Sequence, residues 1–252
     1  MKNILITGGS GKVGFQLVRH FLGNGYKVIT TSTNRERFLD KKHSELSGYN
    51  LENFKVIEVD FSENSALNLI RTFIQSNKIV LTHVIHNARS LRFLKLENDK
   101  TISAENFSGE LFMDVVFPYR LSMELINNAS HKIENIIFIS SMYGVVAPTP
   151  SLYDNFEESS AVHYGVSKAA QIHLTKELAV RLAPEIRVNC VSFGGIKGRT
   201  DKDFESRYKN LTPQQKMLEE EDVIGPVDFL VSDNSNNMTG QNIKVDGGWT
   251  IW

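Results

Sequence analysis

Short runs of branched apolar residues alternate along the chain with longer segments in which apolar residues recur at helical spacing. Continuous Val, Ile and Leu runs are typical of strands covered on both faces. They lie at residues 3–7, 27–31, 55–59, 79–86, 134–140, 187–191 and 243–245. Helical spacing is found at residues 12–22, 65–76, 113–127, 163–182 and 219–231. This alternation predicts an α/β fold with a doubly wound parallel sheet and right-handed crossover helices.

Two segments break the alternation, and no Pro-, Gly- or Ser-rich linker or repeat divides the chain. We therefore predict a single domain over residues 1–252. Residues 142–162 lie between a strand and a strong helix, and residues 197–214 are polar and basic. Ligands of open α/β sheets bind beyond the carboxyl ends of strands. We expect these two segments to form a substrate wall and a mobile lid.

Charge and composition exclude several classes of protein. The chain has 28 Lys and Arg against 29 Asp and Glu, which argues against a nucleic-acid or anionic-membrane binder. No apolar run approaches the roughly 20 residues that span a bilayer, and the first residues do not resemble a secretory signal. A single cysteine, Cys190, and histidines without paired spacing predict neither a disulfide nor a metal site. We expect a cytoplasmic protein with a small-molecule substrate.

A glycine-rich turn joins the first strand to the first helix. Gly8 allows a tight turn, Gly11 lets the backbone approach a pyrophosphate, and Gly14 permits close packing of helix and strand. The helix N-terminus then offers N–H groups to anionic oxygens. The turn therefore predicts a dinucleotide site that contains Gly8, Ser10, Gly11, Lys12, Val13 and Gly14.

The residues after the second and third strands bear on which dinucleotide binds. An Asp or Glu that would hold the ribose hydroxyls of NAD(H) is missing from the end of the second strand, where Thr33 and Arg35 stand instead. Arg35, together with Lys12, suits a 2′-phosphate. We predict NADP(H), with NAD(H) as the alternative. Asp60 and Phe61 follow the third strand and are candidates for the adenine, although such an acid can merely cap a helix.

A tyrosine, a lysine and a serine form the candidate chemical site. Tyr164 and Lys168 share one face of a helix, and Ser141 follows the fifth strand. Carbonyl reduction needs a proton donor for the developing alkoxide. A neighbouring ammonium favours the phenolate form of a tyrosine, and a serine hydroxyl can hold the substrate oxygen. Alone, Tyr and Lys four residues apart are equally compatible with surface packing.

Several motifs together resemble the short-chain dehydrogenase/reductase family over essentially the whole chain. They are the Thr7–Gly8 turn, His86-Asn87-Ala88, Ser141, Tyr164 with Lys168, residues 186–196, and residues 238–249. The resemblance implies a seven-stranded parallel sheet and a homodimer or homotetramer. It implies that Tyr164 is the general acid/base, that Lys168 assists it, and that Ser141 orients the substrate carbonyl. It also assigns cofactor contacts to Asn87, Ala88, Gly194 and Ile196.

Departures from the family pattern leave alternatives open. The glycine spacing is that of the epimerase/dehydratase branch, and His86 and Arg89 flank Asn87. Asp114 stands where the family has a fourth catalytic residue, an Asn, with Pro118 close behind it to bend the helix. The alternatives are therefore a sugar epimerase or dehydratase with retained cofactor, and a non-catalytic dinucleotide-binding protein.

The segment between Ser141 and Tyr164 is long for the compact branch of the family. Its Tyr153, Asp154, Glu157 and Glu158 offer hydrogen bonds to a polyol or sugar. In this respect the chain resembles dehydrogenases of bacterial surface-glycan and flagellin-modification pathways. The primary hypothesis is an NADP(H)-dependent oxidoreductase that interconverts an alcohol and a carbonyl on a small polar substrate. Four basic residues are candidates to bind an anionic group of that substrate or to be solvated charges: Arg89, Arg92, Lys197 and Arg199.

Overall fold

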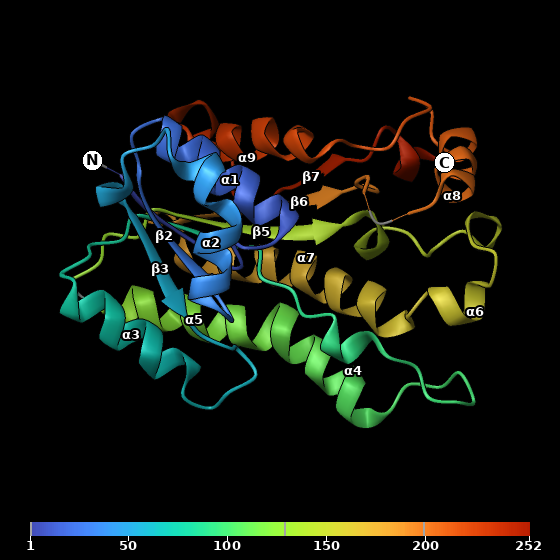
Figure 1. The fold of residues 1–252 in the computed structure, drawn as a ribbon, viewed down its shortest axis with the longest axis horizontal. Coiled ribbons are helices and arrows are strands. Elements are labelled where there is room, and N and C mark those ends of the chain that lie inside the picture. The colour runs from blue at the N-terminus through green and yellow to red at the C-terminus, as the bar shows by residue number, and fades with distance from the viewer. Residues whose placement is uncertain (1, 129, 199) are drawn as a thin grey trace.

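The computed structural model describes residues 2–128, 130–198 and 200–252, and these form one α/β domain around a single sheet. Figure 1 shows the sheet edge-on between two layers of helices. All seven strands are parallel, in the order β3-β2-β1-β4-β5-β6-β7. The doubly wound, seven-stranded fold is confirmed. Arg199 lies outside the described residues.

The strands follow the apolar runs closely. Their bounds are β1 Asn3–Ile6, β2 Lys27–Ser32, β3 Phe54–Glu58, β4 His83–His86, β5 Asn135–Ser141, β6 Arg187–Phe193 and β7 Asn242–Val245. Every residue of β4 and β5 is buried, as expected for strands covered on both faces. The chain crosses from one half of the sheet to the other between β3 and β4, so the carboxyl ends of β1 and β4 form the switch point where ligands bind.

The helices cover both faces of the sheet. Their bounds are α1 Lys12–Gly23, α2 Arg35–Leu46, α3 Ala66–Ser76, α4 Ala104–Leu111, α5 Phe117–Asn127, α6 Phe156–Ser159, α7 Val162–Leu182, α8 Lys202–Leu211 and α9 Ile224–Val231. One apolar core joins the sheet to α1, α2 and α9, and the other joins it to α3, α5 and α7. Across the described ranges, no helix is both long and apolar enough to cross a bilayer.

The helix expected at residues 113–127 is part of a longer helical run with a wide turn inside it. A π-helical turn at Phe112–Val116 separates α4 from α5. Pro118, at the start of α5, has no N–H to donate to the carbonyl of Asp114 four residues earlier. The side-chain amide of Gln171, on α7, donates to that carbonyl at 3.1 Å instead. The bend therefore places Asp114 against α7.

The two segments that break the sequence pattern pack against each other beyond the carboxyl ends of β5 and β6. Residues 142–162 hold two 3₁₀ turns and α6, and residues 197–214 contain α8, which the apolar pattern did not predict. A third apolar cluster joins them; its buried members are Met142, Leu152, Tyr208, Met217 and Trp249. Arg207 of α8 donates to the carbonyl of Leu152 at 2.8 Å. The expected substrate wall, residues 142–162, and the expected lid, residues 197–214, are thus packed together as one unit.

Candidate active site

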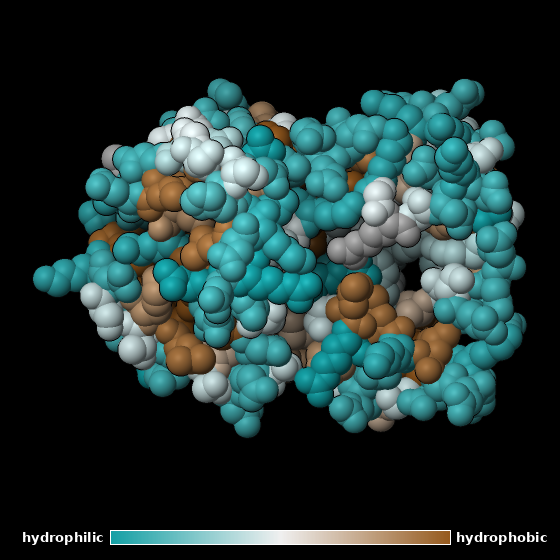
Figure 2. Space-filling view, viewed as in Figure 1, coloured by the Kyte–Doolittle hydropathy of each residue, from teal (hydrophilic) through white to brown (hydrophobic). Residues whose placement is uncertain are grey.

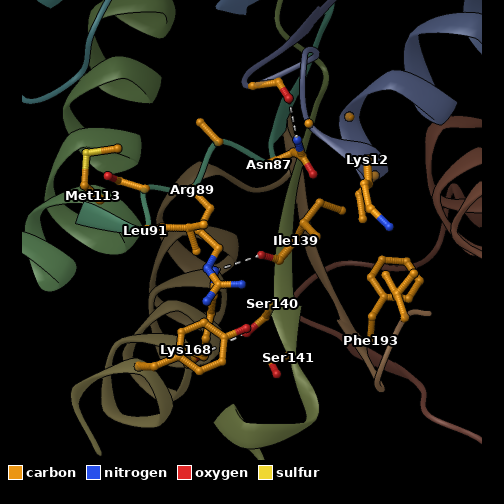
Figure 3. Close-up of a pocket in the computed structure, with 18 of the residues that line it drawn as sticks. Lys12, Asn87, Arg89, Leu91, Met113, Ile139, Ser140, Ser141, Lys168 and Phe193 are labelled. Carbon is orange, nitrogen blue, oxygen red and sulfur yellow. Dashed lines mark hydrogen bonds between the residues drawn. The ribbon is translucent and has the colours of Figure 1, made fainter. Parts of the chain in front are cut away.

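A cavity of about 730 Å³ opens at the carboxyl ends of the strands. It runs from the glycine-rich turn to the wall formed by residues 142–162 and α8, and Figure 2 shows the surface hollowed on the side that carries α6 and α8. In Figure 3, Lys12 and Phe193 lie on one side of the cavity, and Arg89, Leu91 and Met113 lie on the other. This is the site that the switch-point rule predicts.

Most of the residues expected at the cofactor and chemical sites line this one cavity. They are Gly8, Ser10, Gly11, Lys12, Val13, Gly14, Thr33, Asp60, Phe61, Asn87, Ala88, Ser141, Tyr164, Lys168, Gly194 and Ile196. Arg35 and Asp114 are not among the lining residues. The structure therefore brings the cofactor site and the chemical site into one cavity. Arg35 and Asp114 lie outside the lining of this cavity.

The glycine-rich turn is crowded in a way that only glycine permits. Gly8 has a φ of +71°, and a Cβ on Gly14 would lie 2.3 Å from the carbonyl oxygen of Gly8. Asn87 braces the turn, because its side-chain amide donates to the carbonyls of Thr7 and Gly8 at 3.0 and 3.2 Å. The hydroxyl of Thr7 in turn accepts from the N–H of Ala88 at 2.9 Å. The close approach needed to hold a pyrophosphate is therefore built into β1, β4 and α1.

Of the two cations expected at a 2′-phosphate, Lys12 is paired with an acid and Arg35 has an exposed side chain. Lys12 lines the cavity, but its Nζ lies 3.0 Å from the carboxylate of Glu220 and donates to the carbonyl of Lys197 at 3.2 Å. Arg35 is exposed at the start of α2, and its backbone N–H donates to the carboxylate of Glu58 at 2.8 Å. The lining at the end of β2 consists of Thr31–Thr33.

Tyr164 and Lys168 lie on successive turns of α7, opposite the end of β5. The Nζ of Lys168 is 5.8 Å from the centre of the Tyr164 ring. Ser141 ends β5, and its hydroxyl accepts from the N–H of Tyr143 at 3.2 Å. All three side chains line the cavity, so one ligand can meet a phenol, an ammonium and a serine hydroxyl together.

Asp114 lies behind Lys168, not on the cavity. Its carboxylate is 3.0 Å from the Nζ of Lys168 and accepts from the hydroxyl of Ser167 at 2.7 Å. The two side chains of this ion pair are 1% and 6% exposed. Burial opposes the ammonium form of Lys168, but the Asp114 carboxylate and Tyr164 together outweigh burial and raise the pKa of Lys168 above its ordinary value. Asp114 therefore keeps Lys168 charged and fixes where its ammonium lies.

Of the three basic candidates that the structure describes, Arg89 reaches this part of the cavity. Its guanidinium lies over the Tyr164 ring, 4.5 Å from the ring centre. Arg92 instead lies over the ring of Phe93, and Lys197 pairs with Glu219. Neither of those two side chains lines the cavity.

Aromatic side chains form the outer wall of the cavity. The hydroxyls of Tyr143 and Tyr153 are 2.6 Å apart, and burial raises the pKa of Tyr143. Phe204, Tyr208 and Met217 continue this lining. The acids of the segment turn away from it: Asp154 pairs with Arg207 at 2.9 Å, and Glu157 and Glu158 pair with Lys100. The hydrogen-bonding groups offered to a ligand are thus phenols and not carboxylates.

Two residues beside the site are core residues. His86 lies stacked on Phe138 and hydrogen-bonds the hydroxyl of Ser122 at 2.8 Å, and burial lowers its pKa to about 3. Cys190 is fully buried, which raises the pKa of its thiol to about 12. Cys190 is therefore a small core residue. His86 points into the core although it precedes Asn87.

Glu110 is a buried acid near the site that no sequence motif singled out. This residue is fully buried on α4, and neither carboxyl oxygen has a hydrogen-bond partner. A signal was present in the sequence, since Glu110 lies four residues before Asp114 and so on the same side of a helix. The sequence does not show that α7 packs against the side of the helix that carries Glu110 and Asp114.

Comparisons with known proteins agree with this architecture. A family model described as enoyl-(acyl carrier protein) reductase matches residues 10–250. Post-translational flagellin modification protein A of Campylobacter coli is 40% identical over 118 residues, so the match spans about half of each chain, 46% in both cases. The NADH-dependent L-xylulose reductase of Ambrosiozyma monospora is 28% identical over 98% of this chain and 94% of its own.

A solved structure gives the same result at full length. It is a short-chain dehydrogenase from Leptospira borgpetersenii with bound NAD⁺, with a TM-score of 0.83 and 29% identity. The match covers 99% of this chain and 92% of that one. By its fold, its site and these relatives, the chain belongs to the short-chain dehydrogenase/reductase family, a family of oxidoreductases that act on CH–OH groups.

Proposed function

We propose that this protein interconverts an alcohol and a carbonyl on a small polar substrate, with Tyr164, Lys168 and Ser141 as the catalytic residues. The observation that carries the proposal is that these three side chains and the glycine-rich turn line one cavity. A nicotinamide dinucleotide fits the turn, which is closed enough at Gly8 and Gly14 to exclude any Cβ, and when bound it supplies or accepts the hydride.

The residues of the chain handle the proton and the substrate oxygen. In the reducing direction the Tyr164 hydroxyl gives its proton to the oxygen of the carbonyl while the carbon receives hydride. The ammonium of Lys168, held by Asp114 at 3.0 Å, stabilises the phenolate that remains. The Ser141 hydroxyl holds the substrate oxygen against the tyrosine.

The direct test is Tyr164→Phe, which removes the hydroxyl and leaves the ring under Arg89. We expect turnover to fall by a factor on the order of 10³ or more, because a general acid is lost. Cofactor affinity, measured by fluorescence titration, should change by less than about threefold. Tyr119→Phe, on the exposed surface of α5, is the matched control. Turnover retained in the Tyr164 variant would overturn the assignment.

For the cofactor we propose a preference for NADP(H) over NAD(H). Support comes from the cavity lining at the end of β2, Thr31–Thr33, which contains no acid, and from Arg35, whose exposed side chain starts the next helix. The names of the xylulose reductase and of the solved structure mention NADH and NAD⁺, which are the alternative cofactor. The test is to measure the Kd of NADPH and of NADH for wild type and for Arg35→Ala. Arg37→Ala, on the same helix, is the control. A phosphate contact predicts that only the Arg35 variant loses NADPH affinity, by about tenfold or more.

For the substrate we propose a small polyhydroxylated compound such as a sugar derivative. The phenol pair of Tyr143 and Tyr153 beside Ser141 supplies hydrogen-bonding groups and aromatic faces at once. The L-xylulose reductase and the flagellin-modification protein are relatives whose names fit such a substrate. A panel of keto-sugars, their phosphates and simple ketones, followed by cofactor absorbance, tests it; turnover of simple ketones alone would reject the polyol class.

We also propose that the chain assembles as a homodimer or homotetramer. Large apolar side chains are exposed on α5 and α7, namely Tyr119, Val162, Val166 and Val180. Light scattering during gel filtration measures the mass directly, and a mass of 28.5 kDa, that of one chain, would reject assembly.

A further inference from the structure

We propose that Arg89 forms an oxyanion site in the cavity, so that the substrate of Tyr164 carries a carboxylate or a phosphate close to its reacting carbonyl. This proposal rests on the proposed function and narrows its substrate class from polyhydroxylated compounds to acidic ones. The proton transfer itself uses Tyr164, Lys168 and Ser141. Arg89 instead contacts the substrate and selects it by charge.

The backbone that carries Arg89 is fixed by the fold. Arg89 follows Asn87 and Ala88, whose N–H groups both donate to the hydroxyl of Thr7 at 2.9 Å. Its side chain therefore begins beside the join of β1 with β4, at the switch point of the sheet. From there it extends into the cavity, toward Lys168 in Figure 3.

The guanidinium of Arg89 is held by an aromatic ring and not by an acceptor. It lies over the Tyr164 ring, 4.5 Å from the ring centre, a position that attracts a cation. A guanidinium has five N–H donors in a rigid fork. Within residues 2–128, 130–198 and 200–252, none of those of Arg89 donates a hydrogen bond to the protein. The ring thus positions the charge, and the donors remain available to a ligand.

Arg89 differs in this respect from the two other cations that line the cavity. The ammonium groups of Lys12 and Lys168 are each 3.0 Å from a carboxylate, of Glu220 and Asp114 respectively. No Asp or Glu of the described residues forms an ion pair with Arg89. Its positive charge is therefore the one in the cavity lining that the protein leaves uncompensated.

The acid in the cavity lining lies in another part of the cavity. This acid is Asp60, after β3, and its carboxylate accepts from the N–H and the hydroxyl of Ser62 at 2.9 and 2.7 Å. In the sheet, β2, β1 and β4 separate β3 from β5, and Tyr164 lies opposite the end of β5. The lining near Tyr164 thus has a net positive charge, and the low-dielectric walls of a hollow strengthen the attraction of such a charge for an anion.

The chemistry of the guanidinium indicates which anions fit. Its planar fork matches carboxylate and phosphate oxygens with two parallel N–H···O bonds. The Tyr164 ring has Arg89 over its face and the proton-donating hydroxyl at its edge. One small molecule meets both groups when few bonds separate its oxyanion from its carbonyl. This geometry favours 2-keto acids and the phosphates of short hydroxyketones.

The first experiment uses two pairs of ketones that differ in charge. 2-Ketogluconate has a carboxylate where fructose has a hydroxymethyl group, and dihydroxyacetone phosphate has a phosphate where dihydroxyacetone has a hydroxyl. We expect wild type to prefer the charged member of a pair in kcat/KM. Arg89→Ala should reduce that preference by about 10- to 100-fold, mainly through KM, because charged hydrogen bonds are lost. Arg89→Lys, which keeps the charge but not the fork, should give an intermediate value.

Arg92→Ala is the matched control for this experiment. Arg92 is also exposed and close in sequence, but its side chain does not line the cavity, so the preference should remain. An unchanged preference in Arg89→Ala would overturn the proposal. An equal loss for the charged and the neutral member would also overturn it, since Arg89 would then act on Tyr164 and not on an anion.

A second measurement does not depend on turnover, and it decides if none of the four ketones is reduced. It uses Tyr164→Phe, which keeps the ring under Arg89, with and without saturating NADPH. Phenylglyoxal modifies arginine side chains, and peptide mass spectrometry gives the rates at Arg89 and Arg92. At constant ionic strength, phosphate or malonate should slow the modification of Arg89 by about threefold or more, and glycerol should not. Arg92 should react at one rate throughout.

The outcomes of this measurement separate the sources of the oxyanion. Protection by phosphate alone supports a phosphorylated substrate, and protection by malonate alone supports a carboxylate. Protection by NADPH with no further effect of either anion would overturn the proposal, because Arg89 would then bind the cofactor. Modification that neither anion slows would also overturn it. These results stand whether or not Tyr164→Phe retains turnover, so failure here and failure of the proposed function are distinguishable.

Discussion

Removal of the Asp114 carboxylate should destabilise the fold and disturb the catalytic lysine together. Asp114→Ala leaves the ammonium of Lys168 buried with one remaining hydrogen bond, to the carbonyl of Ile139 at 3.4 Å. The Asp114 side chain is 1% exposed, so water cannot replace it where it stands. Breaking a buried ion pair from one side costs about 3–5 kcal/mol. At about 2–4 °C per kcal/mol for a chain of this size, Tm should fall by about 10 °C.

Two further variants separate charge from hydrogen bonding. Asp114→Asn keeps an oxygen that can accept from Lys168 but removes the charge. We therefore expect the free energy of unfolding to fall by less, about 1–3 kcal/mol. Without the carboxylate, burial, the largest influence on Lys168, should lower its pKa, and the alkaline limit of the reductase activity should move to lower pH. The control is Glu157→Ala, which removes an exposed pair with Lys100 and should cost less than about 1 kcal/mol.

The assay is thermal unfolding of all three variants at pH 7, followed by the pH profile of kcat for those that fold. The reasoning predicts a clear order of Tm, with Ala lowest, Asn next, and the surface variant close to wild type. If Asp114→Ala unfolded within about 2 °C of wild type, the buried pair would contribute little and the role given to Asp114 would be wrong. An Asn variant with an unshifted profile would separately refute the electrostatic effect on Lys168.

Two other predictions test the cofactor turn and Glu110. Gly14→Ala should abolish dinucleotide binding in a titration while the chain stays folded, since a Cβ there would lie 2.3 Å from the Gly8 carbonyl; Gly225→Ala, which meets no atom within 4 Å, should bind normally. Glu110→Gln should gain stability over wild type as pH rises. The folded-state pKa of Glu110, about 7, exceeds its ordinary 4.5, so protonation favours the fold and wild type loses about 3 kcal/mol between those values. Urea unfolding at pH 5 and 8.5 measures this, and parallel pH dependences would contradict it.

The strands and most helices were predictable because buried parallel strands are continuous Val and Ile runs that few other structures contain. α2, α4, α6 and α8 were not predicted. The sequences of α2 and α8 are largely charged, and the stability of these two helices comes from contacts outside the helix. In α2 the side chain of Asn34 caps the first turn, and Phe38 packs into the core. In α8, Tyr208 stacks on Trp249, which lies 41 residues further along the chain. No local pattern contains such contacts.

The candidate site divides in the same way. Tyr164 and Lys168 were predictable from helical spacing, and Gly8 and Gly14 from backbone requirements, since both are local properties. The pairing of Lys12 with Glu220 was not, because the two residues lie far apart in the sequence. A charge seen in sequence shows what a side chain can bind, but only the fold shows which partner is nearer.

The departures from the family pattern lie together in space although they are scattered in sequence. The sequence motifs predict that Arg89 stands in place of a family glycine and Asp114 in place of a neutral Asn. The two substitutions place a cation over the Tyr164 ring and an anion behind Lys168. Asp114 neutralises the buried Lys168, and the charge of the exposed Arg89 acts on Lys168 in the opposite direction. The three residues are therefore best understood as one electrostatic unit, in which a change at any member alters the work done by the others.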